Sequence, residues 1–249
     1  MVLFFNLNSF KMKKNTNETS PRRKFLGTIV TGAAALGLST FGSTALAKAG
    51  ALSPVENTHN DLSDADEWFN KINGKHRVVY DVSQPHEGNE LIMPFAWAKV
   101  FLMTNAATGT PEKDSSVVTV WRHSAIPFAM EDRLWAKYKF GEMFKINDGA
   151  TNAQAVRNMF WKPNPAFSIP GVGPVPIGIN ELQDSGAMFC VCNMAITVYS
   201  AVAAQKMNLK HEDVMKDWLS GLLPNVQVVP SGVWALGRAQ EHKCAYIKA

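Results

Sequence analysis

Residues 187–192, which read AMFCVC, constrain the fold more than any other stretch because every position in them is apolar. Side chains alternate between the two faces of a strand, so we expect Phe189 and Val191 to share one face. Cys190 and Cys192 would then share the opposite face. A strand that is apolar on both faces is typical of a parallel sheet that helices cover on both sides. This stretch therefore predicts a buried central strand.

Further strands and helices alternate along the chain. Short runs rich in β-branched residues predict strands, and longer runs with apolar residues every three or four positions predict helices. The expected strands span 76–82, 116–121, 226–230 and 244–248, and the expected helices span 64–71, 90–107, 128–138, 152–160, 194–206, 211–222 and 232–242. This order predicts an α/β fold, a three-layer sandwich with a mostly parallel five-stranded sheet.

The N-terminus has the features of an export signal. Arg22 and Arg23 precede a stretch rich in Gly, Ala and Thr, and residues 45–47 form an Ala-Leu-Ala cleavage signal. Residues 1–47 therefore resemble a twin-arginine signal peptide, which directs a folded protein to the periplasm or the exterior. With a cleaved signal, the protein contacts the membrane only transiently, during export. The alternatives are a retained membrane anchor and a start of translation at Met12.

The rest of the chain divides into a polar lead-in segment, 48–74, and one expected α/β domain, 75–249. A proline-rich insertion near 162–179 interrupts this domain and holds five of the 13 prolines. Beyond residue 47, 19 of the 25 Lys and Arg remain, against 20 of the 21 Asp and Glu. Because this part has no basic excess, we expect it to bind no nucleic acid.

The carboxyl ends of the expected strands identify the candidate site. In open parallel sheets, ligands bind beyond these ends, near the point where the strand order reverses. The side chains expected there are His86 and Glu87 after the first strand, His123 and Ser124 after the second, Cys192 and Asn193 after the third, and Ser231, also an expected helix cap, after the fourth. Together they would supply a nucleophile, proton acceptors and polar binding groups.

The cysteines leave several interpretations open. Cys190 and Cys192 would lie roughly 6.6 Å apart on one strand with parallel side chains, which disfavours a disulfide. A metal site formed by both and His123 lacks the usual ligand spacings. Cys190 alone fits core packing. Cys192 precedes a helix that Asn193 is expected to cap, and the free amides there favour a thiolate. Cys192 is therefore either reactive or structural.

Several short motifs occur in an order typical of one family. They are RVVYDV at 77–82, VVTVWRHSAI at 117–126, FCVCNMAI at 189–196, LLPNVQVVPSGVWALGRAQ at 222–240 and AYIK at 245–248. With them, residues 75–249 resemble the DsrE/DsrF-like family. The resemblance implies a small α/β sandwich that forms homo-oligomers. It also implies, as in some members, a persulfide on the cysteine that matches Cys192. We expect no cofactor and no metal.

Three features depart from the family pattern. Ser124 and Cys244 stand where glycine is common, and export removes the protein from the usual sulfur-relay partners. The sequence favours an exported, thiol-dependent sulfur-handling or redox accessory protein, with Cys192 as the carrier and His123 or His86 as the proton partner. Its expected partner is a protein that donates or accepts sulfur. The alternative is a non-enzymatic binding or oligomeric assembly module with structural cysteines.

Overall fold

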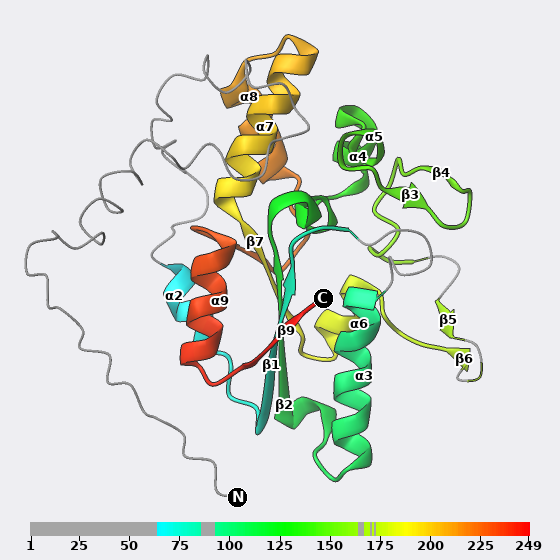
Figure 1. Ribbon diagram of the computed structural model, residues 1–249, viewed down its shortest axis with the longest axis vertical. Coiled ribbons are helices and arrows are strands. Elements are labelled where there is room, and N and C mark those ends of the chain that lie inside the picture. Colours follow the sequence, from blue (N-terminus) through cyan, green and yellow to red (C-terminus); the bar gives the residue numbers. More distant parts are fainter. Residues whose placement is uncertain (1–63, 86–92, 164–166, 170, 172) are drawn as a thin grey trace, which may run out of the picture. The chain divides into compact units, whose positions relative to one another are not determined.

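A five-stranded sheet forms the centre of the computed structural model (Figure 1). Its strands are β1 (His76–Val82), β2 (Ser115–Trp121), β7 (Met188–Cys192), β8 (Val226–Val229) and β9 (Ala245–Lys248), in the order β8-β7-β2-β1-β9. Every neighbouring pair is parallel. The expected α/β fold with a mostly parallel five-stranded sheet is therefore confirmed.

The structure describes residues 64–85, 93–163, 167–169, 171 and 173–249. All of them belong to one compact unit, Asn57–Ala249. The predicted signal peptide and most of the lead-in segment lie outside the described residues. Within the described ranges, no helix has both the length and the apolar character that a membrane span requires.

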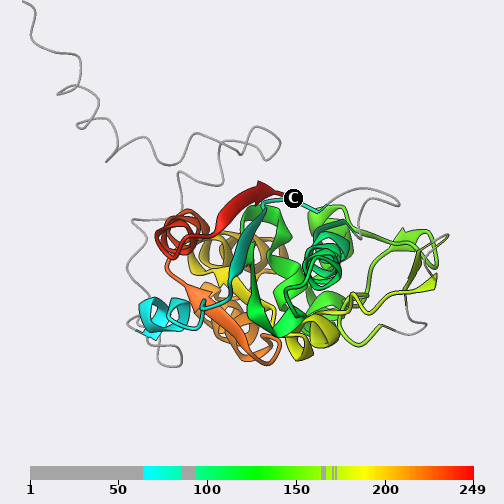
Figure 2. The same ribbon diagram turned by 90° about the horizontal axis from the view of Figure 1, so that it is seen from below.

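Helices cover both faces of the sheet. On one face, α2 (Asp64–Phe69) and α9 (Gly232–Glu241) pack in a cluster with Val79, Val120 and Cys190. The second cluster, on the other face, contains residues of α3 (Met93–Ala107), α4 (Asp132–Tyr138), α5 (Phe140–Phe144), α6 (Ile179–Asp184), α7 (Asn193–Met207) and α8 (His211–Ser220). Figure 2 shows α2 and α9, cyan and red, on the opposite side of the sheet from α3.

The direction of the crossovers explains this division of the helices. The chain moves from β1 to β2, β7 and β8 in one direction along the sheet, and it then returns to the far edge to form β9. Right-handed crossovers place the helices of the outward steps on one face and the helix of the return step, α9, on the other. β7 and β8 are therefore neighbouring strands whose following helices begin on opposite faces.

The helix expected at 128–138 begins later, at α4. It is preceded by the 3-10 helix η3 (His123–Ala129) and by an extended segment. That segment pairs with the chain after α8: Met130 forms an antiparallel bridge with Leu222, and Glu131 N donates to Gly221 O at 2.9 Å. Because these long-range bonds use the backbone of residues 130 and 131, the prediction of a helix there was wrong.

The prediction of a helix at 152–160 was also wrong. Ala153–Gln154 forms β4, which pairs with β3 (Asn147–Asp148). Ala155 extends this pairing, since its N–H donates to Ile146 O at 2.9 Å. The backbone here is committed to a neighbouring segment and cannot form helical bonds.

The proline-rich insertion contains a small hairpin of β5 (Ser168–Ile169) and β6 (Gly173–Pro174). The short helix α6 follows it and was not predicted. Its first turn is stabilised by Glu181, whose carboxylate accepts the backbone N–H of Gly178 at 2.8 Å. A second 3-10 turn, η2 (Glu112–Asp114), precedes β2.

Candidate functional site

The carboxyl ends of β7 and β8 form the topological switch point of the sheet. The chain leaves β7 into α7 on one face and leaves β8 into α9 on the other, which is the arrangement beside which open α/β sheets bind ligands. The two loops are joined by a backbone bond from Met194 N to Pro230 O at 3.3 Å. Cys192, Asn193 and Ser231 therefore come together here.

Cys192 is the N-cap of α7, and its Sγ accepts the backbone N–H of Ala195 at 3.3 Å. The prediction that Asn193 caps this helix was therefore wrong, because Asn193 is the first helical residue. Its Oδ1 is buried and has no hydrogen-bond partner in the described part of the chain. The Cys192 thiol thus contacts one of the otherwise unpaired amides of a helix start.

The burial of Cys192 differs from the expected alternation. Cys192 is 6% exposed and packs in the same cluster as Phe189 and Val191, whereas Cys190 packs in the cluster beneath α9. The reason is that the chain turns from strand to helix at Cys192, so the two-residue period ends there. The two thiols therefore belong to different environments.

Ser231 caps α9 as expected, because its Oγ accepts the backbone N–H of Trp234 at 3.2 Å. Next to it, Gly232 lies against Arg122, which follows β2. A β-carbon at position 232 would lie 2.5 Å from Cβ of Arg122, so only glycine leaves room for the arginine stem.

Arg122 forms a two-pronged ion pair with Asp81 of β1. Its Nε donates to Oδ1 at 2.6 Å and its Nη2 to Oδ2 at 2.9 Å, and the hydroxyl of Tyr246 in β9 donates to Oδ2 at 2.8 Å. The Asp81 side chain is 3% exposed and that of Arg122 is 29% exposed. Burial alone would raise the pKa of Asp81, but the bonds from Arg122 and Tyr246 outweigh burial and hold it below its usual value.

Arg122 also lies beside Cys192. The register pairs Trp121 with Val191, so the next residues along the two parallel strands are neighbours. Hydrogen bonding to Asp81 raises the pKa of Arg122, and the negative charge of a Cys192 thiolate contributes to the same rise. The switch point therefore combines a thiol, a helix start and a fixed cation.

His123 and Ser124 follow Arg122 at the end of β2. His123 has a left-handed backbone, with φ of 51°, and its Nδ1 lies 3.3 Å from the hydroxyl of Tyr199 in α7. Partial burial lowers the pKa of His123, and the charge of Arg122 lowers it further, so the imidazole is mainly neutral at pH 7. Ser124 donates its backbone N–H to Ser83 O at 3.1 Å.

Hydrogen bonds do not connect all of the site residues that were predicted from the sequence. No hydrogen bond joins Cys192 to His123 or Ser124 within the described residues. His86 and Glu87 lie outside the described residues. Sequence analysis missed Arg122, Asp81, Tyr246 and Tyr199. One sequence signal could have revealed the ion pair. Asp81 is an acidic residue in a stretch that otherwise predicts a buried strand, and a buried charge requires a partner.

The other two cysteines are also buried: Cys190 lies inside β7, two residues before Cys192, and Cys244 precedes β9. Burial and the nearby Cys192 raise the pKa of the Cys190 thiol, and burial raises the pKa of Cys244 to about 11. All three thiols are free. In the described ranges, no group of three or more His, Cys, Asp or Glu side chains is arranged to hold a metal ion.

Iodoacetamide should alkylate Cys192 faster than Cys190 in the folded protein at neutral pH. Cys190 lies inside β7 with no exposed surface, whereas Cys192 ends the strand and keeps a small exposed area. Mass spectrometry of partly labelled protein gives both rates, and urea-unfolded protein, in which the two rates should converge, is the control. Equally slow labelling of both thiols in the folded state would leave Cys192 a structural residue.

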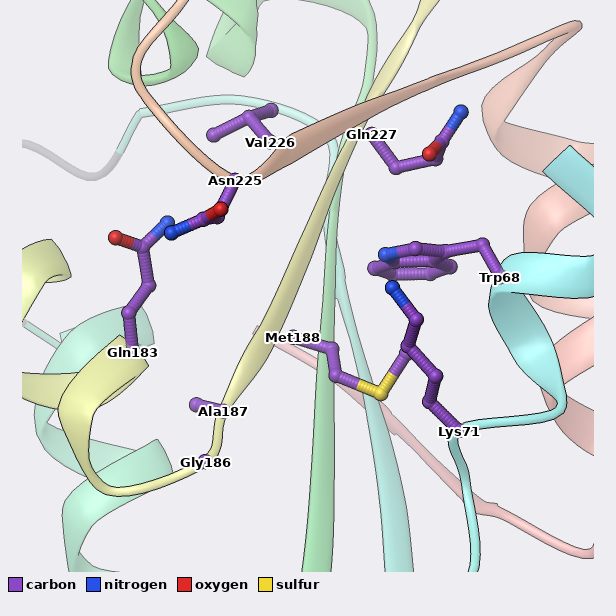
Figure 3. A pocket seen from close by; sticks show the side chains of 9 residues that line it. All are labelled: Trp68, Lys71, Gln183, Gly186, Ala187, Met188, Asn225, Val226 and Gln227. Atoms are coloured by element: carbon purple, nitrogen blue, oxygen red, sulfur yellow. The ribbon is translucent and has the colours of Figure 1, made fainter. Parts of the chain in front are cut away.

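A separate cavity of about 400 Å³ opens at the opposite, amino-terminal end of β7 and β8 (Figure 3). Trp68, Lys71 and Met188 line one side of it, and Gln183 and Asn225 line the other. Lys71 is the one ionisable side chain among its lining residues. Apart from Lys71, the lining residues therefore offer no acid, base or nucleophile.

Comparisons with known proteins give no family for this chain. No family model matches it, and no curated protein matches it. A protein of unknown function, MTH1491 from Methanobacterium thermoautotrophicum, is similar in structure with a TM-score of 0.37 and 15% sequence identity. The match covers 70% of this chain and 100% of that chain.

Proposed function

We propose that this protein carries sulfur as a persulfide on Cys192. The main support is the bond from the Ala195 amide to Cys192 Sγ, beside the cation of Arg122. Amide donors at a helix start and a neighbouring cation favour anionic sulfur, which is the nucleophilic form. The resemblance of residues 75–249 to the DsrE/DsrF-like family agrees with this chemistry.

The proposed reaction requires no oxidant. The Cys192 thiolate attacks the outer sulfur of a donor persulfide, RSSH. The new S–S bond forms as the S–S bond of the donor breaks, and the donor leaves as a thiolate. The proton of the outer sulfur passes to this thiolate, so the products are a Cys192 persulfide anion and RSH. Transfer to an acceptor thiol is the same exchange in reverse.

His123 is the proposed proton partner of Cys192. Its neutral imidazole at pH 7 can accept a proton from the thiol before attack. In the tautomer in which Nδ1 carries the hydrogen and donates it to the Tyr199 hydroxyl, Nε2 is the unprotonated nitrogen for this role. His86 is the second candidate proposed from the sequence.

The expected location and partners complete the proposal. The paired arginines at 22 and 23 and the cleavage signal at 45–47 favour export by the twin-arginine route, to the periplasm or the exterior. The partners would be a protein that donates or accepts sulfur and further copies of this chain.

A second candidate function, a non-enzymatic binding or assembly module, is favoured by a different observation. Trp97, Val100 and Met103 are exposed at three-residue spacing along α3, and they form an apolar stripe on the outer side of this helix. In such a module, Cys192 would serve only as a cap of α7. The two functions differ in whether chemistry depends on the thiol.

Cys192→Ser should abolish cyanide-releasable sulfur, because it removes the nucleophile while its hydroxyl keeps the cap of α7. The wild-type protein, incubated with glutathione persulfide and then desalted, should hold about one such sulfur per chain. Cys244→Ser is the matched control, because Cys244 is an equally buried thiol away from the switch point, and it should load normally.

Intact mass of the exported protein, with and without reductant, tests the same proposal from another side. It should report cleavage near Ala47 and a reductant-sensitive gain of sulfur that C192S lacks. Wild-type protein that accepts no sulfur from glutathione persulfide would reject the carrier function and leave the assembly module.

A further inference from the structure

The ion pair between Arg122 and Asp81 has a feature that charge balance alone does not explain. A buried carboxylate needs one partner, yet Asp81 receives Nε and Nη2 of Arg122 together with the hydroxyl of Tyr246. The stem of Arg122 is also confined by Gly232 in the first turn of α9. The guanidinium is therefore fixed in position from three strands and one helix.

The fixed guanidinium keeps part of its hydrogen-bonding capacity. Asp81 uses Nε and one N–H of Nη2, and Nη1 makes no hydrogen bond within the described part of the chain. The strand register brings Arg122 next to Cys192, and the charge of a Cys192 thiolate contributes to the raised pKa of Arg122. A guanidinium with free N–H groups is a strong donor to a neighbouring anion.

We propose that Arg122 holds the anionic outer sulfur of the Cys192 persulfide, and that Asp81 and Tyr246 are positioning residues that fix the guanidinium for this role. This inference rests on the proposed carrier function. In the transfer reaction, the outer sulfur becomes anionic when its proton passes to the leaving thiolate, and Arg122 N–H groups stabilise that charge. No bond of Arg122 forms or breaks covalently.

The arrangement also explains why a buried aspartate is present. Without the two hydrogen bonds to Asp81, the Arg122 side chain would adopt many rotamers, and its charge would not be directed at one atom. Asp81 removes that freedom at the cost of burying a charge, which the ion pair offsets. The net charge of the pair is zero, so the donor geometry and not an excess of positive charge is the selective element.

The test measures the equilibrium loading of Cys192 from glutathione persulfide in full-length protein. Arg122→Gln should lower the ratio of loaded to free Cys192 about tenfold, as expected for the loss of a hydrogen bond to a charged group. Arg122→Lys, which keeps the cation, should recover part of the loading. Arg133→Gln is the matched control, because Arg133 also binds an aspartate, Asp217, but from α4. It should load like wild type.

A double variant separates the chemical role from a structural one. Asp81→Asn with Arg122→Gln removes both charges, so no unpaired charge stays buried and folding is preserved. It should still load about tenfold less than wild type.

Loading of the double variant at the wild-type level would overturn the role of Arg122 while leaving the carrier function intact. Absence of loading in wild type would instead reject the carrier function, and with it this inference.

Discussion

Replacing Arg122 with glutamine should lower the free energy of unfolding by about 3 kcal/mol at pH 7. The change leaves Asp81 ionised and 3% exposed, with Tyr246 as its one remaining direct donor among the described residues. Removal of one partner of a buried ion pair is costly because the other charge stays desolvated. Urea denaturation followed by circular dichroism measures the effect.

The pH dependence of this loss follows from Asp81. In the folded wild type, Arg122, Tyr246 and the nearby Lys248 hold the pKa of Asp81 below its usual value, against the effect of burial. The ionised carboxylate therefore contributes stability that is present at neutral pH and is lost as the pH falls through the lowered pKa. Without Arg122, burial raises the pKa and favours the protonated form. The difference between the two proteins should therefore begin to shrink above the ordinary aspartate pKa of about 3.9, as the pH falls through the raised pKa of the variant, and it should shrink further down to the lowered pKa of the wild type.

The charge-neutral double variant is the control for this prediction. Asp81→Asn combined with Arg122→Gln should be more stable at pH 7 than Arg122→Gln alone, since no unpaired carboxylate is buried. Both side chains touch, so their effects should not add. A single variant as stable as wild type at pH 7 would mean that water reaches Asp81 and that the pair is not desolvated.

The fold could be predicted because its strands have distinctive compositions. The stretch at 76–82 is rich in valine, and AMFCVC is apolar throughout, which is typical of strands buried on both faces. The helix at α9 was also predictable, because Ser231 caps it and β8 directly precedes it. These signals are local, so one sequence is enough to read them.

The wrong elements share one physical cause. The backbone of residues 130–131 bonds to a segment that is distant in the chain, as in the bond from Glu131 to Gly221. The backbone of residues 153–155 bonds to the preceding strand β3 and to Ile146. Helical propensity favoured a helix at both places, and tertiary pairing prevailed. The partner of such a segment cannot be identified from local composition.

The site could be predicted only in part, for a similar reason. The rule that ligands bind beyond strand ends located Cys192 and Ser231, because it depends only on strand order. The partnership of Asp81 and Arg122 depends on the register of two strands that are adjacent in space, and no local pattern encodes that register. The thiol could therefore be proposed from the sequence, and the cation beside it could not.

Two neighbouring cysteines should respond differently to the same substitution. Cys190→Ser should lower the free energy of unfolding by about 2 kcal/mol, because it introduces a hydroxyl at a position with no exposed surface. β7 is flanked by β2 and β8, so the ladder on both sides already uses the backbone groups that this hydroxyl needs. Cys192→Ser should change stability by less than about 0.5 kcal/mol, because serine is a favourable N-cap and its oxygen replaces Sγ as acceptor of the Ala195 N–H.

Equilibrium unfolding of both single variants in urea measures this contrast. The two variants make the same change, a thiol to a hydroxyl, at positions two residues apart. The comparison also bears on the carrier function, because loss of sulfur loading in Cys192→Ser can be assigned to chemistry only if that variant remains as stable as wild type. A loss of about 2 kcal/mol in Cys192→Ser as well would mean that its hydroxyl fails to replace the thiol at the start of α7. The thiol would then be a packing element, and the proposal that it is available for sulfur transfer would lose its structural basis.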